Sequence, residues 1–235
     1  MLIIQNIDSA TELKTVTLNF FIQASAYSKK LANEARYKSD LLFLGRNRFI
    51  FQVNVTFVEM KTMELSEAIK GRRSVRTYKK LDLPQETIDK LLEAGRWAPS
   101  AGNVQPWAFV VASSPQTKRN LSSAAYGQKD VEEAAVVIVV CADEKRAEQN
   151  YGARGKTLYC LQDTAAAVQN ILLTAYSLGL GSCWVGAFKE EEARKVINAP
   201  KDMRPVALIP IGYPDEAPPP RNRRPVKEIM HKETF

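Results

Sequence analysis

The chain has 235 residues, of which 45% are hydrophobic and 25% are charged, a composition typical of a soluble globular protein with one main core. Its net charge of +7 favours anionic partners, which include nucleic acid, membrane surfaces and phosphorylated small molecules. Three widely spaced cysteines and a single histidine, His231, argue against a disulfide framework, a metal site and a Ser-His-Asp triad.

The first residues carry no sign of export or membrane insertion. The stretch MLIIQNIDSATELK lacks the basic region that precedes the apolar part of a secretory signal. The uncharged stretch TVTLNFFIQASAYS is too short to cross a bilayer. Since the cysteines read as reduced thiols, we expect a cytoplasmic protein that binds no membrane.

Residues 1–62 differ from the rest of the chain. The stretch FIFQVNVTFV has an apolar residue at every second position and predicts a strand, but no motif surrounds it. Met60 and Met63 stand directly before the first regular pattern. Residues 1–62 are therefore either a genuine extension or residues upstream of a natural start at Met60 or Met63, and we favour the second interpretation.

The regular patterns begin at Met63. LSEAIKGR predicts a short helix, and PQETIDKLLEAGRWA predicts a longer helix with Pro84 in its first turn. The apolar stripe of this longer helix consists of Ile88, Leu91, Leu92 and Trp97. WAFVVAS predicts a strand, and SPQTKRNLSSAA predicts a helix with Ser114 as its N-cap.

The second half of the chain alternates buried strands with helices. AAVVIVVCA is apolar throughout and predicts a strand buried on both faces. Residues 156–181 predict the longest helix, ending at Gly179 and packed in the core or against a partner subunit. SCWVGAF predicts a short strand or turn, KEEEARKVINA an amphipathic helix and RPVALIPIGYP a buried strand. The Pro- and Arg-rich residues 215–235 predict an extended arm.

Four short stretches present polar groups in patterns suited to a ligand. In RRSVR, the side chains of Arg72, Ser74 and Arg76 share one side of an extended chain, with Arg73 opposite, which suits a phosphate. Two guanidinium groups in RNRRP, Arg221 and Arg223 of the arm, could reach the same anion. Each stretch also has a plain alternative as a solvated basic turn or tail.

The other two stretches are loops. APSAGNVQPW offers polar side chains between prolines, which suits the edge of a flat heteroaromatic ligand or a simple helix-to-strand turn. GLGSCWVGAF has three glycines that permit close backbone approach, or that merely form a tight connection with Trp184 in the core. It is not a GxGxxG sequence after a strand, so a Rossmann pyrophosphate site is not indicated.

Taken together, these stretches resemble the nitroreductase-like flavoprotein family over residues 63–235. The combination RRSVRxY, APSxxNxQPW, GLGxxWVGxF, IGYP and RxRRP is specific, whereas no single part is. The resemblance implies an α+β sandwich with a central, mostly antiparallel sheet flanked by helices. It also implies a domain-swapped homodimer that binds two FMN molecules at the subunit interface.

The resemblance also implies roles for individual residues. Arg72 and Ser74, with Arg73 beside them, match positions at the FMN phosphate and ribityl chain, and Arg76 matches a basic residue near flavin N1 and O2. The loop that closes over the flavin from the other subunit is matched by Pro99, Ser100, Asn103 and, more weakly, Gln105. The turn whose backbone amides face flavin N5 and O4 is matched by Val185, Gly186 and Ala187, and the phosphate ligands of the arm by Arg221 and Arg223.

Gly186 is a departure, because some relatives carry a carboxylate there, and this puts side-chain contacts to nicotinamide or substrate in doubt. The extra Asn and Lys that some relatives place beside the pyrimidine ring have no convincing counterpart.

The function implied is hydride transfer from NADH or NADPH to FMN N5 and then to a nitroaromatic, quinone or similar small acceptor, in a two-step cycle. No catalytic side chain and no metal is expected, because the cofactor supplies the chemistry. Alternatives are a same-fold dehalogenase, flavin-modifying enzyme or dehydrogenase, and a non-catalytic flavin-binding redox module. A nucleic-acid binder is disfavoured, since no aromatics are interleaved with the basic residues.

Overall fold

The computed structural model describes residues 35–43, 49–57 and 63–235 of a chain that consists of two units, Met1–Thr62 and Met63–Phe235. In the first unit, β1 (Ala35–Phe43) and β2 (Phe49–Phe57) form an antiparallel pair with Ala35 opposite Phe57. The strand predicted from FIFQVNVTFV is therefore present as β2.

The second unit is built on a four-stranded sheet. Its strands are β3 (Trp107–Ala112), β4 (Val136–Asp143), β5 (Gly181–Ser182) and β6 (Met203–Gly212), in the spatial order β3-β4-β6-β5. Every neighbouring pair is antiparallel, so the predicted α+β fold with an antiparallel sheet is confirmed. Residues 136–142 of β4 are all buried, as their continuous apolar run predicts.

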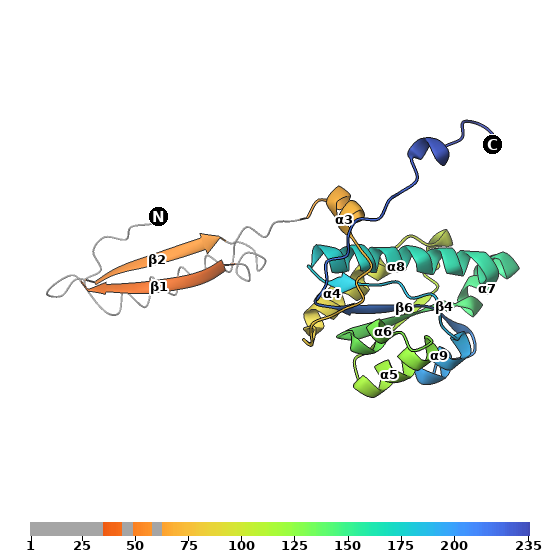
Figure 1. Ribbon diagram of the computed structural model, residues 1–235, viewed down its shortest axis with the longest axis horizontal. Coiled ribbons are helices and arrows are strands. Elements are labelled where there is room, and N and C mark those ends of the chain that lie inside the picture. Colours follow the sequence, from red (N-terminus) through yellow and green to blue (C-terminus); the bar gives the residue numbers. More distant parts are fainter. Residues whose placement is uncertain (1–34, 44–48, 58–62) are drawn as a thin grey trace. The chain divides into compact units, whose positions relative to one another are not determined.

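Helices cover both faces of this sheet (Figure 1). Their bounds are α3 Leu65–Gly71, α4 Gln85–Arg96, α5 Pro115–Ala124, α6 Lys129–Glu133, α7 Glu144–Arg154, α8 Cys160–Ser177 and α9 Glu190–Val196. Shorter turns are η1 (Ala101–Asn103), the π-helical η2 (Gly155–Tyr159) and η3 (Val226–Glu228). None of the helices in the described part of the chain is long and apolar enough to cross a membrane.

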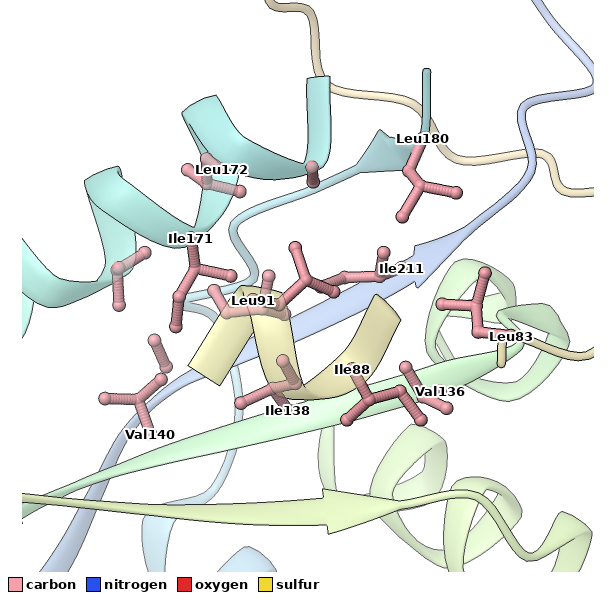
Figure 2. Close-up of a cluster of buried hydrophobic side chains, with 14 residues drawn as sticks. Leu83, Ile88, Leu91, Val136, Ile138, Val140, Ile171, Leu172, Leu180 and Ile211 are labelled. Atoms are coloured by element: carbon pink, nitrogen blue, oxygen red, sulfur yellow. The ribbon is translucent and has the colours of Figure 1, made fainter. Parts of the chain in front are cut away.

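The core has two parts, one on each face of the sheet, because alternate residues of a strand point to opposite faces. Figure 2 shows one side, where Ile138 of β4 packs with Leu91 of α4 and Ile171 of α8. The alternate residues of β4, such as Val137 and Val139, pack on the opposite side with residues of α5, α6 and α9. Successive strand side chains point to opposite faces, so β4 supplies both halves of the core.

Several helix ends lie where individual residues of the sequence predicted them. Ser114 caps α5, since its hydroxyl oxygen accepts a hydrogen bond from Thr117 N at 3.1 Å. Pro84 stands directly before α4, with a φ of −59°. The long helix α8 is followed by Gly179, whose φ of +74° suits glycine at the end of a helix.

Three details differ from the prediction. Trp97 lies beyond the end of α4 and is 71% exposed, so its place in the apolar stripe was wrong; its indole N–H instead donates to Glu93. The helix predicted over residues 156–181 is in fact η2 followed by α8. Leu178, which continues its apolar pattern, falls just after α8 and is 40% exposed.

Candidate functional site

The RRSVR stretch is an extended segment that lies beside β5. The preceding helix α3 ends at Gly71, and Arg72 N still donates to Ala68 O at 3.0 Å. Ser74 then forms a parallel bridge with Ser182, and Val75 N donates to Ser182 O at 3.0 Å. The first predicted stretch is therefore in direct contact with the glycine-rich stretch 179–188.

This contact depends on the absence of a side chain at Gly181. A Cβ atom there would lie 2.7 Å from Val75 Cγ1 and 2.9 Å from Val75 Cβ, which is closer than real Cβ atoms approach. Glycine therefore allows the two segments to run side by side. The close approach at Gly181 is to a segment of the same chain, and the approach of a ligand to the other glycines stays a prediction.

Two groups hold the segment to the rest of the domain. The buried phenol of Tyr78 donates to Val75 O at 2.6 Å, with Pro210 O at 3.2 Å. Burial raises the pKa of Tyr78 far above its ordinary value, so the phenol remains a donor. On the exposed side, Glu216 Oε1 accepts hydrogen bonds from the backbone N–H groups of Arg76 and Thr77.

The three arginines of the segment have different surroundings. Arg73 turns back and donates from Nη1 to the carbonyls of Lys70 at 2.6 Å, Gly71 at 3.0 Å and Arg72 at 2.9 Å. Its guanidinium group therefore satisfies carbonyls at the end of α3. Neither Arg72 nor Arg76 is paired with a carboxylate among the residues that the structure describes. These two cations are thus available to an anionic ligand.

The turn after β5 exposes backbone amides. Val185 is locked to β6, because its N donates to Leu208 O at 2.9 Å and its O accepts from Leu208 N at 3.0 Å. Gly186 is exposed, with no atom within 4 Å of the place where a Cβ would stand. Within the described ranges the amides of Gly186 and Ala187 donate no hydrogen bond, so they are available to a ligand. Trp184 is 40% exposed and lies outside the core.

Beneath this turn lies a buried polar pair that the sequence patterns did not indicate. Asp130 is 5% exposed and Cys183 is 2% exposed. Burial raises the pKa of both side chains, while the positive charge of Arg76 acts in the opposite direction on each. Asp130 Oδ2 has no hydrogen-bond partner. No motif marks Asp130, because a lone carboxylate in a five-residue helix looks like any solvated residue.

The loop 99–105 is shaped by its own side chains. Ser100 Oγ accepts from Gln105 N at 2.9 Å, and Gln105 Nε2 donates to Asn103 Oδ1 at 3.1 Å. Gly102, Asn103 and Gln105 have φ values of 53°, 56° and 54°. Three left-handed residues in so short a span define a fixed, uncommon backbone shape. Pro99 and Asn103 are exposed at its surface.

Within one chain, this loop and the RRSVR segment lie at opposite ends of the sheet. The loop leads into Trp107, which pairs with Ala142 at the far end of β4. The segment lies beside Ser182, which pairs with Ile211, which in turn pairs with Val136 at the near end of β4. Six strand residues span about 20 Å. The structure therefore brings residues 72–76 and 182–187 together and leaves the loop apart from them.

The arm is tied to the basic segment only at its start, where Asp215 N donates to Thr77 O at 2.9 Å and Glu216 accepts from Arg76 N and Thr77 N. Residues 217–235 then leave the body of the domain and form no regular element except η3 (Figure 1). Arg221 and Arg223 are exposed, and the one hydrogen bond that the side chain of Arg223 makes in the described structure is to its neighbour Asn222 O. A cleft of about 410 Å³ between α4 and β3 is lined by none of the predicted cofactor-binding residues. The described residues include no cluster of three potential metal ligands.

Fold and geometry together define an α+β protein with a cationic, amide-rich surface at one end of its sheet. Comparison with known proteins gives the assignment: the model of the Nitroreductase family matches residues 69–135 and 122–213. The chain therefore belongs to the nitroreductase family.

Individual relatives agree with this assignment. An NADH dehydrogenase of Thermus thermophilus is 33% identical over 198 residues, which cover 73% of this chain and 97% of the relative. An FMN reductase (NADPH) of Bacillus subtilis is 29% identical over 72% of this chain and 73% of its own length. The solved NADPH:FMN oxidoreductase of Vibrio harveyi, complexed with NAD⁺, superposes with a TM-score of 0.67 at 25% identity, covering 73% of this chain and 77% of that one.

Proposed function

We propose that residues 63–235 form an FMN-binding domain and that the chain is an NAD(P)H-dependent FMN oxidoreductase acting as a homodimer. The relatives named FMN reductase (NADPH), NADH dehydrogenase and NADPH:FMN oxidoreductase support this reaction class. The division of the chain between Thr62 and Met63 supports treating residues 1–62 as a separate extension. The acceptor is proposed to be a small electrophile such as a nitroaromatic compound or a quinone.

One observation carries the proposal: RRSVR and the turn at Gly186 are held against each other. The bridge between Ser74 and Ser182 holds a segment with two unpaired guanidinium groups and a hydroxyl beside the stretch that has the free amides of Gly186 and Ala187. FMN needs cations and a donor for its phosphate, and donors for the polar edge of its ring. The groups present fit both ends of FMN.

Each residue then has a stated task. Arg72 and Ser74 bind the phosphate end, and Arg76 places positive charge at the N1/O2 edge of the ring, where reduction develops negative charge. The amide of Gly186 donates toward N5. Bound FMN would accept hydride from NAD(P)H and deliver it to the acceptor. No side chain has to act as a nucleophile.

The separation of the loop from the segment supports a homodimer. Pro99, Ser100, Asn103 and Gln105 stand about 20 Å along the sheet from residues 72–76 of the same chain. If they cover the flavin, they must come from a second copy. Arg221 and Arg223 are exposed on the part of the arm beyond Glu216, and the proposal places this part of the arm against that second copy.

The test compares Arg72→Ala with Lys80→Ala, a matched loss of charge from the same basic stretch. Lys80 is exposed, and the proposal gives it no contact with FMN. Arg72→Ala should weaken FMN binding by about 10- to 100-fold, because a hydrogen bond to a charged group contributes about 1.5–3 kcal/mol. Lys80→Ala should leave the dissociation constant within about twofold, since an exposed charge contributes little.

The measurement is equilibrium binding of FMN to apoprotein, followed by its absorbance and fluorescence. Equal affinity of the two variants would refute the assigned role of Arg72. A wild-type protein that binds no FMN would refute the proposed function altogether. Anaerobic stopped-flow reduction of the FMN-loaded protein by NADH and NADPH then tests the redox reaction and separates an enzyme from a passive flavin carrier.

A further inference from the structure

The backbone is irregular from the end of α7 to the start of α8. Inside α7, Tyr151 has φ −138° and ψ 19°, and Gly152 has φ 56° and ψ −148°. The π-helical turn η2, Gly155–Tyr159, follows before α8 begins. Such turns are rare and are often found at functional sites. The backbone of Gly152 is in a region that side chains disfavour, so glycine permits this change of direction.

A second glycine makes the irregular turn compact. A Cβ on Gly155 would lie 2.2 Å from Ala147 O, so the turn can pack against the preceding helical turn only because residue 155 has no side chain. The two glycines, Gly152 and Gly155, thus fix the path of the chain around Tyr151, Arg154 and Tyr159. These three side chains have no role in the function proposed above.

The three side chains form a preorganised cluster. The rings of Tyr151 and Tyr159 pack edge to face, with centroids 5.4 Å apart and an interplanar angle of 80°. Arg154 Nε donates to the Tyr159 hydroxyl at 3.0 Å, and Arg154 Cζ lies 5.3 Å from the centre of the Tyr159 ring. The guanidinium group is therefore held in place by the ring beside it.

The charge of Arg154 is not neutralised. Among the described residues no carboxylate pairs with it, and its Nη atoms make no hydrogen bond. Lys156, two residues further along, is instead paired with Glu148 at 3.1 Å. The turn thus contains one neutralised cation and one cation that is oriented and free. An oriented free guanidinium group beside exposed aromatic surface suits an anion attached to a flat ring.

This cluster packs against the loop 99–105. A Cβ on Gly102 would lie 2.2 Å from Tyr151 Oη, so the tyrosine hydroxyl rests directly on the loop backbone. Asp163, in the first turn of α8, accepts from Ala101 N at 3.2 Å. The loop and the cluster are therefore one packed unit, and a ligand covered by the loop would have the cluster at its side.

We infer that Tyr151, Arg154 and Tyr159 form a subsite that selects flat aromatic ligands carrying an anionic group. The inference rests on the proposed function, because it places the loop over the flavin ring. Arg154 binds the anion and the tyrosine rings flank the aromatic part. Two ligands of the reaction have this chemistry: an acceptor such as a nitrobenzoate, and NADPH, whose ribose phosphate is the anion that NADH lacks.

The primary test is equilibrium binding of two unreactive probes to FMN-loaded protein, read from perturbation of the flavin spectrum. Benzoate carries the anion, and benzamide is its neutral counterpart of the same shape. Arg154→Met should weaken the binding of benzoate at least tenfold and the binding of benzamide less than twofold, since only benzoate loses a charge-assisted hydrogen bond. The control Lys156→Met removes a cation from the same turn and should leave both affinities unchanged.

Tyr159→Phe supplies a second variant that keeps the ring. It removes the hydroxyl to which Arg154 Nε donates. The affinity for benzoate should therefore fall by a few-fold, while the affinity for benzamide stays unchanged. Arg154→Lys should restore part of the preference for benzoate. These variants retain the core, so bound FMN and the melting temperature report whether each one has folded.

Kinetics then identify the source of the anion. A drop in kcat/KM for para-nitrobenzoate but not para-nitrobenzamide assigns the subsite to the acceptor. Slower flavin reduction by NADPH but not NADH assigns it to the reductant. Unchanged benzoate binding in Arg154→Met, or equal losses for benzoate and benzamide, would overturn the inference while FMN binding stands. Absence of FMN from the wild-type protein would instead show that the proposed function has failed.

Discussion

Removing the hydroxyl of Tyr78 should destabilise the domain because one buried carbonyl, that of Val75, loses its hydrogen-bond donor. In Tyr78→Phe, Pro210 O keeps a donor, since Cys183 N lies 3.2 Å from it. Val75 O loses its 2.6 Å partner, and no other donor in the described structure reaches it. Val75 is 7% exposed, so water is a poor substitute. An unsatisfied buried acceptor costs about 1–3 kcal/mol.

Thermal unfolding at neutral pH measures this cost. For a domain of this size, 1 kcal/mol corresponds to roughly 2–4 °C, so the melting temperature should fall by about 2–12 °C. Tyr126→Phe is the control, because Tyr126 is 67% exposed and its loss of a hydroxyl should change little. Equal melting temperatures for Tyr78→Phe and wild type would show that the hydroxyl does not support the segment.

Alkaline pH gives the same prediction an independent check. Burial raises the pKa of Tyr78 in the folded state above the unfolded value of about 10, so the folded protein retains a proton that the unfolded chain releases. The stability from this phenol is complete below pH 10 and declines above it, by about 1.4 kcal/mol per pH unit. The difference in free energy of unfolding between wild type and Tyr78→Phe should therefore become smaller between pH 10 and 11. A constant gap would refute the buried, protonated phenol.

Two further substitutions test contacts away from the site. Ser114→Ala should lower the free energy of unfolding by about 1 kcal/mol in urea titrations, because Thr117 N loses its cap at the start of α5. Arg204→Met should lower it by about 1 kcal/mol at pH 7, since Arg204 binds both oxygens of Glu190 at 2.8 Å in a half-exposed pair. Arg204 lowers the pKa of Glu190 in the folded state, so this difference should begin to shrink as the pH falls below the unfolded value of about 4.3 and disappear once Glu190 of the folded protein is protonated.

Local patterns predicted most of the elements because each was decided by nearby residues. The unbroken apolar run of β4 indicated a central strand, and the hydroxyl of Ser114 indicated the start of α5. Trp97 continued an apolar period past the end of its helix, where periodicity no longer reports burial. The irregular turn at Tyr151 escaped prediction, since its shape depends on Gly155 meeting Ala147 O across the helix.

The stretches that form the candidate site could be predicted from the sequence, but which of them lie close together in space could not. Short polar patterns identify groups that suit an anion, and the structure joins two of those stretches through the bridge from Ser74 to Ser182. Which end of the sheet a loop occupies depends on strand register, and sequence periodicity carries no information about register between distant strands. The separation of about 20 Å along β4 between the end near the loop and the end near the RRSVR segment thus became visible only in the structure.

That separation also changes what the basic stretch 71–80 signifies. Five cations in ten residues indicate only affinity for anions, yet their surroundings in the structure differ. Arg73 caps α3 and Lys80 is solvated, whereas Arg72 and Arg76 remain unpaired beside free amides. A strip that bound polyanions would need its charges exposed in a continuous row. Two unpaired guanidinium groups and one hydroxyl within five residues instead suit a single phosphate and the ring attached to it, so these charges support a flavin site over a nucleic-acid surface.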